Sequence, residues 1–492
     1  MLAGVEASKN TIKVNNIRGT GFSNSTLKTP QDAAVVESYY NESAKTFLSI
    51  LGRVNYDFDG KYLLSVTARR DGSSVFGRNK RWGLFPAVSL GYNISEEPFF
   101  DGIKETVNYL KLRASYGISG NAEIGNYAWV SNYAQANYNG ASGITLANIG
   151  DDELGWESAL QTNIGLSMQM FDGKFRLDVD VYEKLTQDLL LPYPVTVLSG
   201  LTQVTTNLGE IKNEGIEAMV GVTLVDKDDF TWDAELTYAW NTNEVIDIGD
   251  NAEGIDIPGF GTTSIYIGKP IGIQTIPIWV GVEPATGQDI YQALDGRHLT
   301  VAEAASEFGS LNNFLNANRV PFGNPYPDFT GGFSSRLTYK NWSVSTLWNF
   351  SVGQTYIASG EQIQGKFAYG SMNITPLRSQ LGRWRNPGDI VRVAQVTTDP
   401  TIWGRTSEYV AEIDYLRMRD LTIAYRFNIQ DSSLVKSVDL FAKFTNFLTF
   451  TNAPGSMYDP ENYVRGGNLN LMDKWKQVPQ AKSVNLGINI KL

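Results

Sequence analysis

A strict two-residue alternation of apolar and polar side chains is the feature that most limits how this chain can fold. Within Lys61–Ile94 the alternation runs for about ten residues, stops at a basic, glycine-rich segment and then resumes. The apolar parity consists of Tyr62, Leu64, Val66, Ala68, Leu84, Pro86, Val88, Leu90, Tyr92 and Ile94. This period is that of a β-strand whose two faces meet different surroundings. A soluble sandwich turns the apolar face inward and a transmembrane barrel turns it toward lipid, so the alternation alone leaves both classes open.

The alternation recurs from one end of the chain to the other, and about fourteen strands can be counted. We expect the first, around Leu2–Ser8, and the last, Val484–Leu492, to be the two edges of the sheet. Unpaired edges are costly in lipid, so these strands either pair with each other or stay open for further strands. Within Tyr415–Phe427 the apolar parity switches, which predicts a β-bulge near Arg419–Asp420.

The connections between the expected strands alternate between short and long. Short turns such as "DFDGK", "FDGK", "DKDD" and "YKN" are each followed by a long loop. The long loops cover roughly Asn10–Lys45, Asp71–Gly83, Ser119–Glu157, Thr186–Glu214, Asn241–Asp328, Gly353–Glu412 and Leu448–Ala481. Transmembrane barrels sort their loops in this way, with short periplasmic turns and long extracellular loops. The loop order therefore favours an all-β, antiparallel transmembrane β-barrel portion.

Aromatic residues bracket the short turns, as in Tyr56 and Phe58, Phe171 and Phe175, or Tyr339 and Trp342. Around a barrel they would form a girdle at the level of the lipid headgroups. The alternative is that they cap the core of a soluble sheet.

Composition excludes several classes of protein. The net charge of −11 argues against a nucleic-acid partner, because little would neutralise phosphates. Cysteine is absent, which removes disulfides and thiolate chemistry. There is no run of about eighteen apolar residues, so we expect no transmembrane helix. The opening "MLAGVEASKN" lacks a basic start, so we do not expect it to be a signal peptide.

Several long motifs resemble one family. They are "LGRVNYDFDGKYLLSVTARRDGSSVFG", "RWGLFPAVSLGYNISEEPFF", "LKLRASYGISGN", "LGWESALQTNIGL", "NLGEIKNEGIE", "RWRNPGD", "IDYLRMRDLTIAY" and "DPEN". In this order they resemble the β-barrel of SusC/RagA-type TonB-dependent outer-membrane transporters over nearly the whole chain. The resemblance implies a barrel of about 22 strands with a plug inside it.

The resemblance also implies what the protein does and where it acts. It implies a multi-pass β-barrel in the outer membrane of a Gram-negative cell, a link to the TonB system, and a SusD-like lipoprotein partner. Such transporters import oligosaccharides or peptides. We expect residues 1–492 to form one domain, the C-terminal part of the barrel, without the signal peptide, the plug and about eight of the strands. From the residues alone, a soluble or surface-attached all-β binding protein, adhesin-like and carbohydrate-binding, remains the alternative.

Aromatic side chains in the long loops are the candidate substrate-binding residues. They are Tyr127, Trp129, Tyr133, Tyr138, Tyr266 and Trp279. Such rings can stack on sugars or dock a partner, and they can equally pack the loops against one another. On the inward face, we expect the basic residues Arg53, Arg69, Lys111, Arg113 and Arg176 to pair with lumen carboxylates such as Asp178 and Asp180 or to contact the plug.

Catalysis and cofactors find little support in the sequence. The single histidine, His298, lies in "LDGRHLTVAEAASEF", which we interpret as a short helix with a surface histidine. No serine stands in a nucleophile elbow, so we expect no enzyme activity. "DFDG" at Asp57–Gly60 is an ordinary hairpin turn, and the acidic tip at Asp151–Glu153 is solvated or holds a loop cation. We therefore expect no cofactor and assign no metal site.

Overall fold

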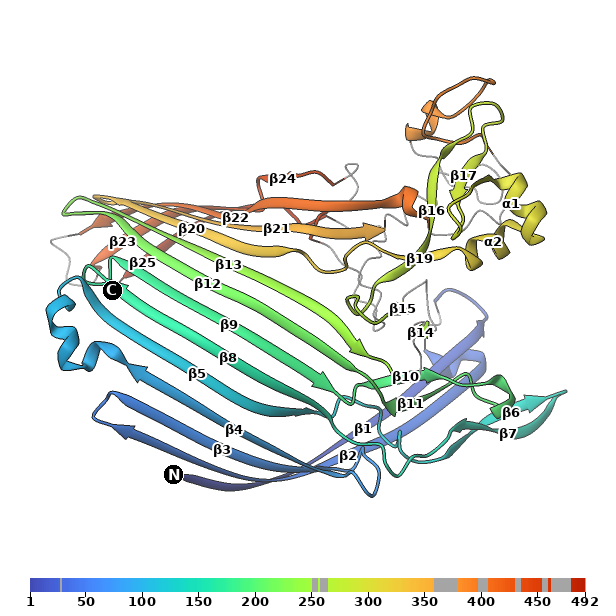
Figure 1. The fold of residues 1–492 in the computed structure, drawn as a ribbon, viewed down its shortest axis with the longest axis horizontal. Helices are drawn as coiled ribbons and strands as arrows, with labels where there is room; N and C mark the ends of the chain where they lie inside the picture. The colour runs from blue at the N-terminus through green and yellow to red at the C-terminus, as the bar shows by residue number, and fades with distance from the viewer. Residues whose placement is uncertain are drawn as a thin grey trace. The chain divides into compact units, whose positions relative to one another are not determined.

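The fold was analysed in a computed structural model, in which the structure describes residues 1–26, 29–249, 255–256, 264–357, 378–396, 406–429, 435–453, 459–461 and 479–491. Regular structure in these residues is nearly all β (Figure 1). Two short helices, α1 (Val301–Phe308) and α2 (Leu311–Ala317), stand next to each other in the sequence. Among the described residues, no helix is both long and apolar enough to cross a bilayer.

One large sheet holds most of the strands, in the order β1-β2-β3-β4-β5-β8-β9-β12-β13-β20-β21-β22-β23-β25, with β24 paired to β22. Their bounds are β1 Leu2–Phe22, β2 Ala33–Phe58, β3 Tyr62–Ser73, β4 Trp82–Asn93, β5 Val107–Asn121, β8 Glu157–Met170, β9 Phe175–Gln187, β12 Glu210–Lys227, β13 Phe230–Asp247, β20 Phe329–Tyr339, β21 Trp342–Ile357, β22 Val410–Asn428, β23 Ser437–Thr445, β24 Thr449–Thr451 and β25 Ser483–Lys491. The order confirms an antiparallel sheet of about fourteen strands with β1 and β25 at its ends.

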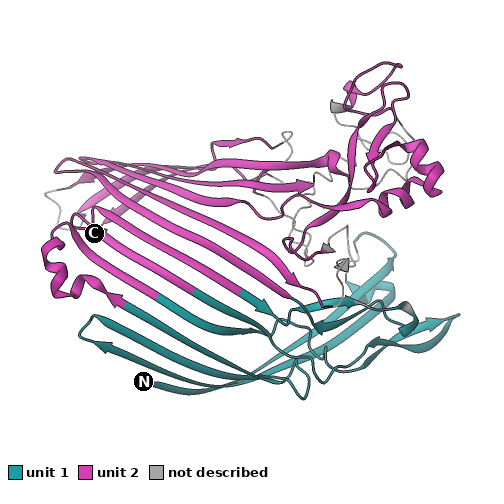
Figure 2. Ribbon diagram, viewed as in Figure 1, with its two compact units in different colours: residues 1–91, 114–162, 185–209 teal, residues 92–113, 163–184, 210–492 magenta. Residues whose placement is uncertain are grey.

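Smaller elements lie in the connections between these strands. The remaining strands are β6 Asn132–Tyr138, β7 Ala141–Asn148, β10 Leu190–Pro194, β11 Gln203–Asn207, β14 Ile255–Asp256, β15 Ser264–Ile265, β16 Gln274–Val282, β17 Asp289–Gln292, β18 His298–Thr300 and β19 Arg319–Phe322. The 3-10 helices are η1 Pro30–Asp32, η2 Ile94–Glu96, η3 Pro98–Ile103, η4 Val197–Ser199, η5 Arg378–Gly382 and η7 Ser407–Tyr409. The chain divides into two compact units, residues 1–91, 114–162 and 185–209 (unit 1) and residues 92–113, 163–184 and 210–492 (unit 2), as Figure 2 shows.

The first hairpin is longer than the sequence predicted. Antiparallel pairing of β1 with β2 runs from Leu2 opposite Arg53 to Phe22 opposite Ala33. The prediction that Asn10–Lys45 forms a long loop is therefore wrong. Exposed apolar rings lie on both faces of this ribbon, for example Tyr39 (60% exposed) and Tyr40 (61% exposed). The two-residue alternation fails there because it arises only where the two faces meet different surroundings.

The predicted bulge in β22 is confirmed. Leu347 of β21 lies opposite Asp420 and Trp348 lies opposite Met418, which leaves Arg419 as the extra residue. A bulge shifts the side-chain parity of the strand by one, and this accounts for the parity switch in the sequence.

The exposed side chains decide which way the apolar face points. Leu84 and Leu90 on β4 are 62% and 56% exposed, and Leu486 and Ile488 on β25 are 79% and 63% exposed. A soluble monomer rarely exposes a contiguous apolar patch of more than a few hundred Å². The apolar face of these strands is an outer surface and not the buried core of a sandwich, which is the arrangement of a membrane barrel.

Short turns gather at one end of the strands in unit 2, as the sequence predicted. The amide of Phe171 donates to the carbonyl of Thr106 (2.9 Å), and the amide of Lys340 donates to that of Asp229 (2.8 Å). In Figure 1 the turns β12–β13 and β20–β21 lie together at the left. These hydrogen bonds join one turn to the next, so neighbouring turns form one rim.

Candidate functional site

A hollow of about 510 Å³ lies on the inward face of unit 2. Its lining includes Asp178, Asp180, Glu217, Thr237, Thr330, Asn349 and Tyr415. These side chains come from neighbouring strands, because the register sets Glu217 opposite Ala239 and Ala239 opposite Thr330. Opposed residues of antiparallel strands share a face, so the two-residue period places these polar groups together on the face away from the apolar one.

The hollow carries an excess of negative charge. Arg113 donates from Nη2 to Asp180 Oδ2 (2.8 Å), and Ser167 Oγ donates to Asp178 Oδ1 (2.6 Å). In the part of the chain that the structure describes, the Glu217 carboxylate has no ion-pair partner. Three carboxylates therefore share the hollow with one guanidinium at its edge, which suits a ligand rich in hydrogen-bond donors or positive charge.

Only part of the predicted pairing of inward basic residues is found. Arg113 pairs with Asp180 as expected. Arg69 also pairs with carboxylates, those of Glu6 (3.0 Å) and Asp71 (2.7 Å). The Arg53 guanidinium bonds to the side chains of Asn55 and Ser65, and that of Arg176 lies over Gly221.

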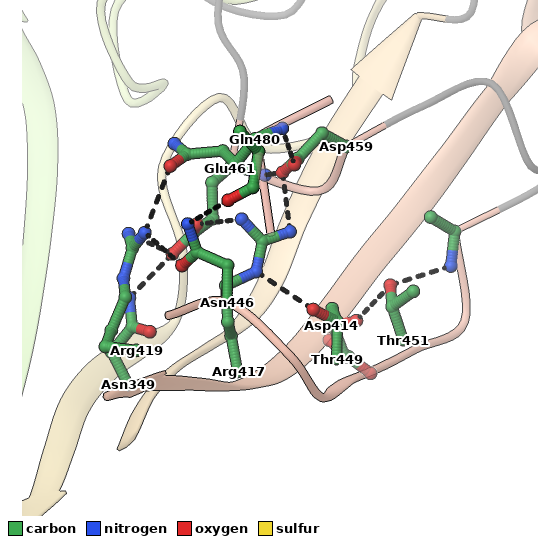
Figure 3. Close-up of polar contacts among 12 residues, drawn as sticks. Asn349, Asp414, Arg417, Arg419, Asn446, Thr449, Thr451, Asp459, Glu461 and Gln480 are labelled. Atoms are coloured by element: carbon green, nitrogen blue, oxygen red, sulfur yellow. Dashed lines mark hydrogen bonds and ion pairs between the residues drawn. The ribbon is translucent and has the colours of Figure 1, made fainter. Parts of the chain in front are cut away.

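Four charged side chains, three of them buried, lie beside the hollow (Figure 3), and we call Arg417, Arg419, Asp459 and Glu461 the inward ion cluster. Arg417 Nη2 lies 2.7 Å from Asp459 Oδ1, and its Nη1 lies 2.5 Å from Glu461 Oε2. Arg419 Nη2 lies 2.5 Å from Glu461 Oε1. The side chains of Arg417, Asp459 and Glu461 are only 3–4% exposed, so the charges are compensated within the protein and not by water.

Hydrogen bonds connect the inward ion cluster to the hollow and to the chain around it. Asn349, which lines the hollow, donates from Nδ2 to Glu461 Oε1 (2.7 Å). The backbone amides of Glu461 and Gln480 donate to the Asp459 carboxylate at 3.0 and 2.9 Å. Together these bonds hold residues 459–461 against β21 and β22.

Opposing effects act on the pKa of Asp459. Burial raises the pKa, but hydrogen bonds from the Arg417 guanidinium and from the amides of Gln480 and Glu461 lower it, and the net result is a pKa below the usual value. The carboxylate therefore stays ionised in the cluster. In the sequence, "DPEN" stands out only as part of a resemblance, and nothing near it points to its partners. The signal was available in β22, where Arg417 and Arg419 stand two residues apart and so point to the same face of the strand.

Two of the candidate aromatic residues project from a hairpin in unit 1. Tyr133 and Tyr138 lie on β6 and are 66% and 86% exposed. They are five residues apart and so lie on opposite faces of the β6–β7 ribbon. Asn139 and Gly140 form its two-residue turn with positive φ angles of 50° and 81°, as in a type I′ hairpin.

Trp129 and Tyr127, also in unit 1, take part in loop packing. Trp129 donates from Nε1 to the carbonyl of Ser74 (3.0 Å), and the guanidinium groups of Arg78 and Arg81 lie 5.6 and 5.4 Å from its ring. The Tyr127 hydroxyl accepts a hydrogen bond from the amide of Ala44 (3.2 Å).

Trp279 and Tyr266 belong to unit 2. Trp279 donates from Nε1 to Asp289 Oδ1 (2.8 Å) and packs against a small core that includes Tyr291 and Phe314. We call β16–β19 with α1 and α2, residues 274–322, the loop module. Tyr266 is half-buried, and its carbonyl accepts from the amide of Lys269 (3.2 Å). The structure thus divides the six candidates between two units.

The motifs "SVFG" and "LGWE" of the resemblance meet in unit 1. The amide of Gly77 donates to the carbonyl of Leu154 (2.8 Å), and the ring of Phe76 lies 4.7 Å from that of Trp156. The carbonyl of Asp152 lies where a Cβ on residue 77 would be, so glycine is required there. The acidic tip at Asp151–Glu153 therefore helps to join two loops.

The structure also places the remaining candidates. His298 is exposed, as predicted, but it lies in β18, directly before α1, so only the second half of the segment expected to be helical forms the helix. Within the described residues, no group of three or more histidine, aspartate or glutamate side chains could hold a metal ion. Asn462, the last residue of "DPEN", lies outside the described residues.

Comparison with known proteins gives a consistent family. The family described as TonB dependent receptor-like, beta-barrel matches residues 8–446. TonB-dependent receptor P39 of Formosa agariphila is 30% identical over 481 residues, which cover 90% of this chain and 46% of the relative. TonB-dependent receptor SusC of Bacteroides thetaiotaomicron is 28% identical over 343 residues, which cover 66% of this chain and 33% of the relative.

Among solved structures, that of the RagAB peptide transporter superposes with a TM-score of 0.82 at 22% identity, covering 99% of this chain and 53% of that one. At this identity the likeness concerns the fold. The chain spans about half the length of the curated relatives it matches.

Proposed function

The chain belongs to the TonB dependent receptor-like β-barrel family, as an outer-membrane β-barrel chain of SusC/RagA type, and from this premise we propose that it forms the channel wall of a TonB-dependent importer. In this proposal residues 1–492 act as one barrel domain. The energy for import comes from the TonB system, and a SusD-like lipoprotein works with the barrel at its extracellular side.

The observation that carries the proposal is the contrast between the two faces of the same strands. Outward positions such as Leu486 are exposed and apolar, and the inward face holds a hollow of about 510 Å³ whose lining includes carboxylates, hydroxyls and an amide. A channel wall needs this division, because one face meets lipid and the other meets a hydrated solute.

An oligosaccharide is the proposed substrate class. Sugar hydroxyls donate well to carboxylates, and the hollow offers Asp178, Asp180 and Glu217. In the loops, the exposed rings of Tyr133 and Tyr138 can stack on sugar rings. We propose these two residues as the first-ranked aromatic contacts. Tyr127, Trp129, Tyr266 and Trp279 are proposed as second-ranked contacts.

A basic peptide is the second candidate substrate. The specific observation in its favour is that the hollow holds three carboxylates and one guanidinium, which attracts positive charge. The solved structure that superposes over almost the whole chain is named as a peptide transporter, which adds to this candidate.

Uptake by cells that make the intact protein tests the proposal. Labelled neutral oligosaccharides and labelled lysine-containing peptides are supplied with and without an active TonB system. We expect TonB-dependent oligosaccharide uptake that falls about tenfold in a Glu217→Gln, Asp178→Asn variant, a loss equivalent to about 1.4 kcal/mol. Glu303→Gln, on the surface of the loop module, is the matched control and leaves uptake unchanged. Uptake of the peptides but not of the oligosaccharides would show that the substrate is a peptide. Uptake that is the same with and without an active TonB system would overturn the transport proposal.

A further inference from the structure

An apolar groove of about 960 Å³ lies on the outward face of unit 2, over β21, β22, β23 and β25. Its walls include Trp342, Tyr425, Phe427, Leu440, Leu486 and Ile488. The register aligns them in rows across the strands, with Trp342 opposite Tyr425, Tyr425 opposite Leu440 and Leu440 opposite Ile488. The groove therefore belongs to the same face as the exposed apolar residues described above.

A small residue creates the groove. In the next row Ala442 stands between Ile423 of β22 and Leu486 of β25. Along β23 the outward neighbours of Ala442 are Leu440 and Phe444, two residues away on either side. The methyl group of Ala442 leaves space between these larger side chains, and a larger residue there would fill the floor of the groove.

One end of the groove is marked by an aromatic trio and a cation. The ring of Tyr425 lies 4.8 Å from that of Trp342 and 4.7 Å from that of Phe427, both in edge-to-face geometry. Trp342 directly follows the short turn after β20, where aromatic residues mark the interface between hydrocarbon and water. Lys436, one residue before β23, is exposed, and its ammonium group has no ion-pair partner in the described part of the chain.

We infer that this groove is a binding site for one phospholipid, with an acyl chain along Ala442 and the phosphate near Lys436. The family places this face in the bilayer, so hydrocarbon is the solvent that meets it. The lining of the groove is mainly apolar, which suits an acyl chain. Aromatic rings at the headgroup level and a cation beyond them match the order of groups along a phospholipid.

Native mass spectrometry of the intact protein, reconstituted with palmitoyl-oleoyl phosphatidylglycerol and then transferred to mild detergent, tests the site. We expect one phospholipid retained per chain. Ala442→Leu fills the floor of the groove and lowers retention about tenfold, equivalent to about 1.4 kcal/mol. Ala68→Leu makes the same change at an exposed position of β3 and leaves retention unchanged.

A second variant protects the test against a folding defect. Lys436→Glu changes an exposed charge outside the strands, and we expect it to lower retention about tenfold by repelling the phosphate. Circular dichroism of each variant checks that the sheet is formed. Equal retention in the Ala442→Leu and Ala68→Leu variants would overturn the inference. The inference would also be overturned if the spectra showed a dimer of the chain without bound lipid, and if only the Ala442→Leu variant lost that dimer.

Discussion

Two arginine-centred ion clusters in unit 2 have nearly the same geometry in very different surroundings. In the inward ion cluster, Arg417 contacts Asp459 and Glu461 at 2.7 and 2.5 Å. In the loop module, Arg297 contacts Asp295 and Glu307, both at 2.7 Å. The side chains of Arg417, Asp459 and Glu461 are 3–4% exposed, whereas those around Arg297 are 42–52% exposed.

The difference teaches that distance alone does not measure what an ion pair contributes. Around Arg297 water competes for every charge, and pairs of this kind contribute little to stability. The side chains around Arg417 are buried from water, so losing one partner leaves an uncompensated charge in a buried site. In the complete set, the attraction between the charges is roughly balanced by the free energy of their desolvation. The inward ion cluster therefore specifies where residues 459–461 lie, whereas the surface cluster contributes little to the stability of the loop module.

The largest effect is expected from Arg417→Ala. The substitution leaves the carboxylates of Asp459 and Glu461 buried without their shared partner, at a cost of about 3–5 kcal/mol. Hydrogen exchange measures it, because the amides of Glu461 and Gln480 donate to Asp459 and are expected to lose protection. Unchanged protection of these amides would show that the cluster does not hold the segment.

A smaller loss is expected when the charges are removed together. The variant Arg417→Met, Asp459→Asn, Glu461→Gln leaves Arg419 on the strand but no buried carboxylate. Replacing a whole buried ion set is often close to neutral, so this variant should keep more amide protection than Arg417→Ala alone. Additive losses over the three positions would contradict the view that stranded charge is the dominant cost.

Acid is expected to release residues 459–461 only at low pH. The pKa of Asp459 is lowered by its hydrogen bonds despite its burial, so its contribution to stability is present above the unfolded pKa of about 3.9 and is lost as pH falls through the lower folded value. Hydrogen exchange, corrected for its intrinsic pH dependence, should show constant protection between about pH 7 and 5. Loss of protection already at about pH 6 would point to another group.

The smallest effect is expected from Arg297→Ala. The pKa of Glu307 is lowered chiefly by its hydrogen bonds from Arg297, and in the variant it should return toward the usual value. The thermal midpoint of the protein should nevertheless stay within experimental scatter, because these groups are solvated. Salt at about 1 M should reduce the pKa difference, since it screens interactions between exposed charges. A clear loss of stability would place the surface cluster in the same class as the inward one.

The alternation in the sequence predicted the strands of the membrane wall and the bulge at Arg419, because lipid on one side and polar surroundings on the other impose a period of two. The same rule could not find residues 10–45 of the first hairpin, where the neighbouring side chains Tyr39 and Tyr40 are both exposed on opposite faces. The alternation also could not tell which loop aromatic residues are packed and which are exposed. Trp129 and Tyr138 look alike in sequence, but Trp129 is held by Ser74 and two arginines, and Tyr138 projects freely.

The sequence by itself determined the strand pattern, the sorting of short turns from long loops, and the family, because these follow from local periodicity and from long collinear motifs. Only the tertiary structure decided which charges are buried, which aromatics are engaged, and where the hollow and the groove lie. Arg417 and Glu461 are 44 residues apart, and Asn349 and Glu461 are 112 apart. Burial and partnership are properties of segments brought together by strand order and register, and a local pattern carries no record of them.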